Sequence, residues 1–183
     1  MICASIFRRG FSTCSSVRNS YKFVVAGGGA GGIGSAAALK RIYGKDASVA
    51  VIEPSQTQYY QPLWTLVGAG AVDFDKTSQP MEKVIPKGCD WLQTKVETFH
   101  PETNTVVTSD GDKISYEYLI VALGLELRFE MVEGLPEALH TDGVCSNYSA
   151  QTVKDTWKTL QNFEGGDALF TLPITPIKCL GAP

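Results

Sequence analysis

Residues 21–32 read YKFVVAGGGAGG, a strand-like apolar run that leads directly into a Gly-x-Gly-x-x-Gly turn. A helical stretch follows, and a second apolar run ends on the acidic residue Glu53. The order of strand, glycine turn, helix, strand and acid is typical of the βαβ unit that binds an ADP-containing dinucleotide. We therefore predict a Rossmann-like α/β fold with a nucleotide site at the glycine turn.

Each residue type in this motif has a physical role. Gly27 permits the tight turn, Gly29 lets backbone amides approach a pyrophosphate, and Gly32 lets the helix pack closely on the strand. The phosphates are expected at the helix N-terminus, where unpaired N–H groups and the helix dipole favour anions. Glu53 is expected to accept hydrogen bonds from a ribose diol. Residues 29–34 also fit the glycine pattern, and a turn that binds nothing is the alternative, but the earlier frame is preferred because Gly27 directly follows the strand.

The rest of the chain adds a second pattern. Segments 91–97, 105–108 and 113–116 are short runs of mixed polarity separated by turn residues, and they predict an antiparallel β-meander, which is followed by an apolar return strand over 118–124. The other expected elements are a helix over 33–45, a buried strand over 49–52, an aromatic loop over 59–66, an amphipathic helix over 150–163 and a strand over 167–172. In the aromatic loop, Tyr60 and Trp64 can be read either as ligand-facing or as core residues.

These patterns divide the chain into three parts. We expect a mitochondrial transit peptide over residues 1–20, an incomplete Rossmann-like domain over 21–145, and the truncated start of a second Rossmann-like domain over 146–183. The leader is rich in Arg and Ser, and the first acidic residue of the chain is Asp46, as is typical of transit peptides. A disordered tail is the alternative. A secretory signal fits less well, because no long apolar core precedes a cleavage site.

Composition excludes several function classes. The chain of 183 residues is 44% hydrophobic, and its net charge of −3 offers no basic surface for nucleic acid. No apolar run reaches the length of about 18 residues that a membrane-spanning helix needs. The five cysteines show no Cys-x-x-Cys spacing, so no metal site is predicted. His100 and His140 stand alone beside turn or loop residues and are interpreted as solvated side chains.

Several longer stretches resemble the sulfide:quinone oxidoreductase family, and the resemblance is strongest to its mitochondrial animal-type members. The most diagnostic are YQPLWTLVGAG at residues 60–70 and PIKCLGAP at residues 176–183. The others are GGGAGGI at 27–33, VIEPS at 51–55, VIP at 84–86, ISYEYLIVALG at 114–124 and SNYS at 146–149. The glycine motif by itself is shared by many flavoproteins, so the two longer stretches are what identify the family.

The resemblance implies an FAD enzyme with two dinucleotide-binding units, peripheral on the inner mitochondrial membrane. It implies oxidation of hydrogen sulfide, transfer of electrons through the flavin to ubiquinone, and delivery of a sulfane sulfur to an acceptor such as glutathione. Residues at positions that match FAD contacts in the family are Ala30, Gly31, Glu53, Gln61 and Val96. Cys179 matches the catalytic cysteine that forms a persulfide, and the adjacent Lys178 would favour its thiolate.

The chain departs from the family in its length. The resemblance implies a second redox cysteine, a late Gly-Asp turn beside the flavin and C-terminal quinone-site helices, all downstream of residue 183. We therefore expect an N-terminal fragment or truncated form that does not turn over sulfide alone. Two alternatives stay open: another FAD enzyme such as a type II NADH:quinone oxidoreductase, and a non-catalytic chain that binds FAD or a partner.

Overall fold

The computed structural model of the chain describes residues 19–139 and 141–171. Cys179, His140 and all but the last two residues of the predicted transit peptide lie outside the described residues. The strands are β1 Ser20–Ala26, β2 Val49–Ile52, β3 Thr57–Tyr59, β4 Ser78–Pro80, β5 Cys89–Leu92, β6 Val96–His100, β7 Thr105–Thr108 and β8 Lys113–Val121. The α-helices are α1 Ala30–Tyr43, α2 Trp64–Gly68, α3 Met81–Val84, α4 Leu135–Ala138 and α5 Val153–Gln161. Short 3₁₀ turns are η1 Gly44–Asp46, η2 Gln61–Leu63, η3 Phe74–Thr77, η4 Pro101–Thr103 and η5 Phe129–Met131.

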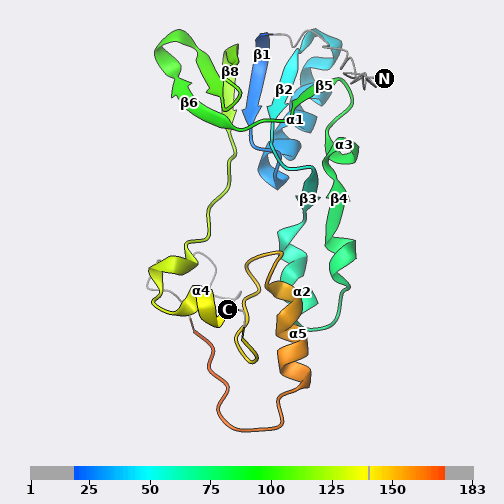
Figure 1. Cartoon of the computed structure of the whole chain (residues 1–183). Helices are drawn as coiled ribbons and strands as arrows, with labels where there is room; N and C mark the ends of the chain where they lie inside the picture. The colour runs from blue at the N-terminus through cyan, green and yellow to red at the C-terminus, as the bar shows by residue number, and fades with distance from the viewer. Residues whose placement is uncertain (1–18, 140, 172–183) are drawn as a thin grey trace, which may run out of the picture.

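The main sheet has the strand order β5-β2-β1-β8-β7-β6 (Figure 1). The first four strands in this order are parallel to one another, whereas β7 pairs antiparallel with both β8 and β6. The last four residues of β1 and all of β2 are apolar and buried, as parallel strands covered on each side require. The predicted Rossmann-like α/β fold with an antiparallel meander is therefore confirmed.

The core lies on both faces of this sheet because alternate residues of a strand point in opposite directions. On one face, Val24 and Ile52 pack with Ile114 of β8. On the other face, Val25 and Val51 belong to a cluster that includes Ala36 of α1. Helix α1 thus covers one face of the sheet, and it starts shortly after the carboxyl end of β1.

The three central strands end level with one another. Ala26 is paired with Ile52 of β2 on one side and with Val121 of β8 on the other. The segments that follow these strands therefore emerge together at one edge of the sheet. In parallel α/β sheets, ligands bind at this carboxyl edge.

The helix predicted over 33–45 spans Ala30–Tyr43 instead. Two strand assignments also differ from the prediction. Residues 91–97 were predicted as one meander strand, which is wrong. The chain turns at Thr94, whose N–H donates to the Leu92 carbonyl at 2.9 Å, so β5 joins β2 in parallel and β6 starts the antiparallel hairpin. Conversely, the segments predicted as separate strands over 113–116 and 118–124 form the single strand β8, because it pairs with β7 at its start and with β1 along most of its length.

The predicted strand over 167–172 is also wrong within its described part. Residues 167–171 form no strand, and Leu169 and Phe170 are 87% and 88% exposed. A strand needs a neighbour for its backbone groups, and the described residues provide none here. The aromatic loop is instead mostly helical, as η2 and α2, with Trp64 buried and Tyr60 half exposed.

Helices α2 and α5 form a second packed region, linked to the sheet by the β3–β4 ladder (Figure 1). Its core contains Trp64, Val67 and Val153. The predicted amphipathic helix over 150–163 therefore packs through Val153, whereas Trp157 and Leu160 on the same side are 40% and 46% exposed. The connection after α2 passes directly beneath the Trp157 ring. An ideal Cβ placed on Gly70 would lie 2.3 Å from a carbon of that ring.

Replacement of Gly70 by alanine is expected to destabilise this region by about 2–4 kcal/mol, because Gly70 has φ +72° and no space for a methyl group. Gly134→Ala is the matched control, since Gly134 has φ +76° but nothing within 4 Å of an ideal Cβ; it should cost only about 1–2 kcal/mol. Urea denaturation followed by tryptophan fluorescence measures both. Equal losses would show that Trp157 does not confine Gly70.

Candidate dinucleotide site

The glycine turn adopts the geometry that the earlier motif frame requires. Gly27 has φ +107°, and an ideal Cβ there would lie 2.3 Å from the Ala122 carbonyl oxygen. An ideal Cβ on Gly32 would lie 1.9 Å from the Gly27 carbonyl oxygen. Both positions exclude every side chain, which confirms the turn and packing roles predicted for Gly27 and Gly32.

The N-terminus of α1 is open. Gly29 is its N-cap residue, no side chain caps the helix, and its first turn contains no acidic residue. Nothing lies within 4 Å of an ideal Cβ on Gly29, so the space in front of the helix is accessible. Ala30 and Gly31 begin the helix at this point. Unpaired backbone N–H groups at such a helix end are suited to a phosphate.

The Glu53 carboxylate faces this turn. Its Oε2 accepts a hydrogen bond from the Gly28 N–H at 2.7 Å, and its Oε1 accepts one from the Ser55 N–H at 2.8 Å. The indole Nε1 of Trp91 donates to the Glu53 carbonyl at 2.8 Å and fixes the backbone. Each carboxylate oxygen can accept more than one hydrogen bond, so the carboxylate retains acceptor capacity for a diol.

Gly28 is a requirement that sequence reasoning missed. An ideal Cβ on Gly28 would lie 2.6 Å from Cγ of Glu53, so any side chain would displace the carboxylate. The run of three glycines at 27–29 is the signal that could have revealed it, because the motif itself needs only the first and third.

A cavity of about 190 Å³ lies at this edge of the sheet. It is lined by Gly27, Ile52, Glu53, Pro54, Lys95, Val96 and Leu123. The structure therefore brings together three of the predicted site residues, Gly27, Glu53 and Val96. It does not place Gln61 among them: Gln61 is exposed in η2, beyond the β3–β4 ladder. Sequence reasoning missed Lys95, which as a turn lysine carries no motif signal.

A second cavity is larger, about 320 Å³, and is lined by Gln56, Pro80, Glu82, Trp91 and Gln93. None of the predicted site residues lines it. The smaller cavity is the better candidate, because it contains both the glycine turn and the carboxylate, and because the open end of α1 adjoins that turn. The unobstructed N–H groups at the helix end fit the phosphates of a dinucleotide, and the acceptor carboxylate beside them fits its ribose.

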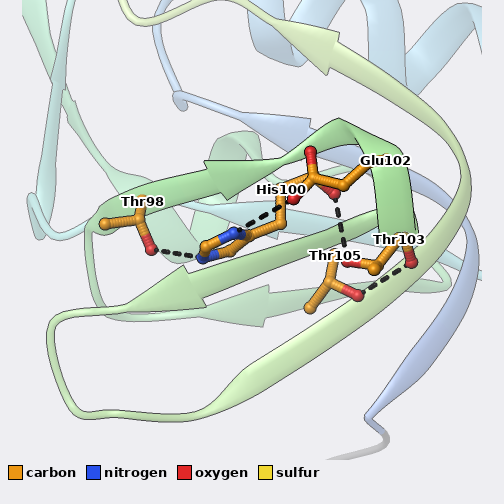
Figure 2. A network of polar contacts seen from close by, with 5 residues as sticks. All are labelled: Thr98, His100, Glu102, Thr103 and Thr105. Carbon is orange, nitrogen blue, oxygen red and sulfur yellow. Dashed lines mark hydrogen bonds and ion pairs between the residues drawn. The ribbon is translucent and has the colours of Figure 1, made fainter.

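The other chemistry-bearing residues lie apart from this cavity. Partial burial raises the pKa of the Cys89 thiol, and the nearby Lys40 only partly opposes this shift, so Cys89 is a poor nucleophile. Figure 2 shows His100 at the end of β6, with Nε2 3.1 Å from Thr98 Oγ1 and Nδ1 3.5 Å from Glu102 Oε1. These contacts stay within β6 and the β6–β7 connection, and the His100 side chain is half exposed.

Within 19–139 and 141–171, no three His, Cys, Asp or Glu side chains come together as metal ligands would. No helix in the described part of the chain is both long and apolar enough to span a membrane.

Comparison with known proteins places this geometry in a family. The pyridine nucleotide-disulphide oxidoreductase profile matches residues 21–163. Mitochondrial sulfide:quinone oxidoreductase of Mus musculus is 48% identical over 93% of this chain and 38% of that protein. The Dictyostelium discoideum protein of the same name is 42% identical over 91% of this chain and 37% of that protein. The X-ray structure of sulfide:quinone oxidoreductase from Aquifex aeolicus superposes with a TM-score of 0.59 at 28% identity, covering 79% of this chain and 32% of that chain.

The chain thus spans a little over a third of the length of the curated relatives it matches. These matches confirm the resemblance to the sulfide:quinone oxidoreductases that the sequence motifs indicated, and they imply a flavin or dinucleotide cofactor. The chain belongs to the pyridine nucleotide-disulphide oxidoreductase family.

Proposed function

We propose that this chain forms the FAD-binding part of a mitochondrial sulfide:quinone oxidoreductase. The observation that carries the proposal is the 48% identity to the mouse protein of that name over 93% of the chain. The cavity between the glycine turn, Glu53 and Val96 supports it independently, since it offers the groups that an ADP moiety needs.

Each residue has a proposed role toward FAD. The first amides of α1, at Ala30 and Gly31, bind the pyrophosphate, and Gly29 leaves their approach clear. Glu53 accepts hydrogen bonds from the adenosine ribose, and Val96 presents its backbone to the adenine. Gln61, on η2, would contact the flavin end of the cofactor, as the family resemblance implies. When bound, the flavin supplies a two-electron acceptor.

The proposed reaction removes two electrons from hydrogen sulfide and passes them to ubiquinone, which also takes up two protons. Cys179 holds the resulting sulfane sulfur as a persulfide, and a thiol acceptor such as glutathione then removes it. Electron transfer to a lipid-soluble quinone requires the enzyme to sit at a membrane surface, and we propose the inner mitochondrial membrane. Residues 1–20 would direct the chain to the mitochondrion.

The test begins with the purified chain, which is expected to bind added FAD and to carry visible flavin absorbance after gel filtration. A protein that takes up no FAD would overturn the proposal.

A full-length version of the protein then separates the sulfide enzyme from an NADH:quinone oxidoreductase. Sulfide added without oxygen should bleach the flavin of the full-length wild type, as Cys179 becomes a persulfide, and should leave Cys179→Ser yellow. Bleaching by NADH with no response to sulfide would favour the other enzyme. Cys145→Ser is the control, because Cys145 is a free cysteine outside the cavity, and it should bleach as the wild type does.

A further inference from the structure

Lys95 contributes the cationic side chain among the residues that line the candidate cavity. It lies in the turn between β5 and β6, immediately before Val96. The turn is anchored, because the Ser109 N–H donates to the Lys95 carbonyl at 3.0 Å and Thr94 Oγ1 lies 3.0 Å from Ser109 Oγ. The lysine backbone is therefore held at the cavity wall while its side chain stays adjustable.

The Lys95 ammonium is paired only weakly. Its Nζ lies 3.3 Å from Glu97 Oε2, and the two side chains are 63% and 56% exposed. Exposed ion pairs of this kind contribute between nothing and about 1 kcal/mol. An acceptor group of a ligand in the cavity can therefore replace Glu97 at little cost.

The charges around the cavity explain why a lysine would strengthen nucleotide binding there. Glu53 brings a negative charge toward a ligand that itself carries two phosphates, and the open helix end of α1 offers only partial positive charge. A full positive charge on the same cavity wall reduces this repulsion. The lysine stem can also cover the apolar surface of Pro54 and Val96 beside an adenine ring.

We propose that Lys95 is a nucleotide-binding residue, whose ammonium leaves Glu97 to contact the adenosine-bearing half of the bound dinucleotide. This inference rests on the proposed function, since it concerns the site proposed for FAD. According to this proposal, the β5–β6 turn contributes to the affinity for the dinucleotide in addition to the glycine motif.

The experiment measures the dissociation constants of FAD and of ADP for the full chain by titration calorimetry, at low and at high salt. Lys95→Met keeps the stem and removes the charge. It is expected to bind both ligands about 3- to 10-fold more weakly at low salt, with a smaller difference at high salt. The matched control is Lys76→Met, because Lys76 forms an equally long exposed ion pair with Asp73, at 3.3 Å, and does not line the cavity.

A third variant separates binding from a structural role of the ion pair. Glu97→Gln frees the lysine and should bind FAD as tightly as the wild type or more tightly. If Glu97→Gln weakens binding as much as Lys95→Met, or if Lys95→Met matches Lys76→Met, Lys95 is not a nucleotide-binding residue. If the wild type binds neither FAD nor ADP, the proposed function fails, and this inference fails with it.

Discussion

Gly32→Val is expected to unfold the sheet-and-α1 unit or to destabilise it by roughly 3 kcal/mol or more, and to abolish FAD binding. The reason is that a side chain at position 32 would clash with the protein backbone. An ideal Cβ at this position would lie 1.9 Å from the Gly27 carbonyl oxygen and 3.3 Å from a Val25 methyl group. The neighbour that would have to move is main chain between β1 and α1, and that segment is itself confined by Ala122. No side-chain rotation relieves such a clash.

The same helix contains a matched control. Gly34 lies two residues further along α1, and nothing lies within 4 Å of an ideal Cβ there. Gly34→Ala should therefore stabilise the chain by about 0.5–1 kcal/mol, because alanine is the better helix former. Thermal unfolding followed by circular dichroism measures both variants, and FAD titration follows. A folded Gly32→Val chain with wild-type FAD affinity would show that α1 does not need to approach β1 so closely.

The contrast between Gly32 and Gly34 shows what the sequence could and could not predict. The βαβ unit was predictable because its signals are local: a glycine turn after an apolar run, and Glu53-Pro54 at the end of β2. Strand β2 was predicted with the bounds that the structure has. Which of several glycines is sterically obligatory was partly predictable, from the motif, but the clash of a Gly28 side chain with Glu53 depends on a contact across 25 residues.

The local sequence pattern could not predict β5 either, because the position of this strand also depends on contacts between residues far apart in the sequence. Residues 91–97 form one short run of mixed polarity without Gly or Pro, which favours one antiparallel strand, yet β5 pairs in parallel with β2. The bond from the Trp91 indole to the Glu53 carbonyl joins residues 38 apart and helps to hold β5 there. Such pairing depends on which sheet edge is free, and periodicity carries no information about that. The strand predicted over 167–172 failed by the same rule, since hydrophobicity alone does not provide a partner.

Glu53→Gln is expected to weaken binding of ADP and FAD by roughly 10- to 100-fold, the range that the loss of charge-assisted hydrogen bonds gives. The carboxylate accepts the Gly28 N–H with one oxygen and the Ser55 N–H with the other. A carboxamide has one acceptor oxygen, so its NH₂ group must face one of these two N–H donors. The variant therefore disturbs the turn and removes the acceptor for the ribose diol at the same time.

The charge of Glu53 also gives the variant a qualitative signature. A carboxylate beside the ribose repels a 2′-phosphate, so the wild type should bind ADP more tightly than adenosine 2′,5′-bisphosphate. Glu53→Gln removes that repulsion and should narrow the preference between the two nucleotides, while Glu82→Gln, a neutralised carboxylate outside the cavity, should leave it unchanged. Calorimetric titration of the three proteins with both nucleotides decides the matter. If Glu53→Gln keeps both the affinity and the preference of Glu82→Gln, the ribose does not lie at Glu53, and the nucleotide must be oriented differently in the cavity.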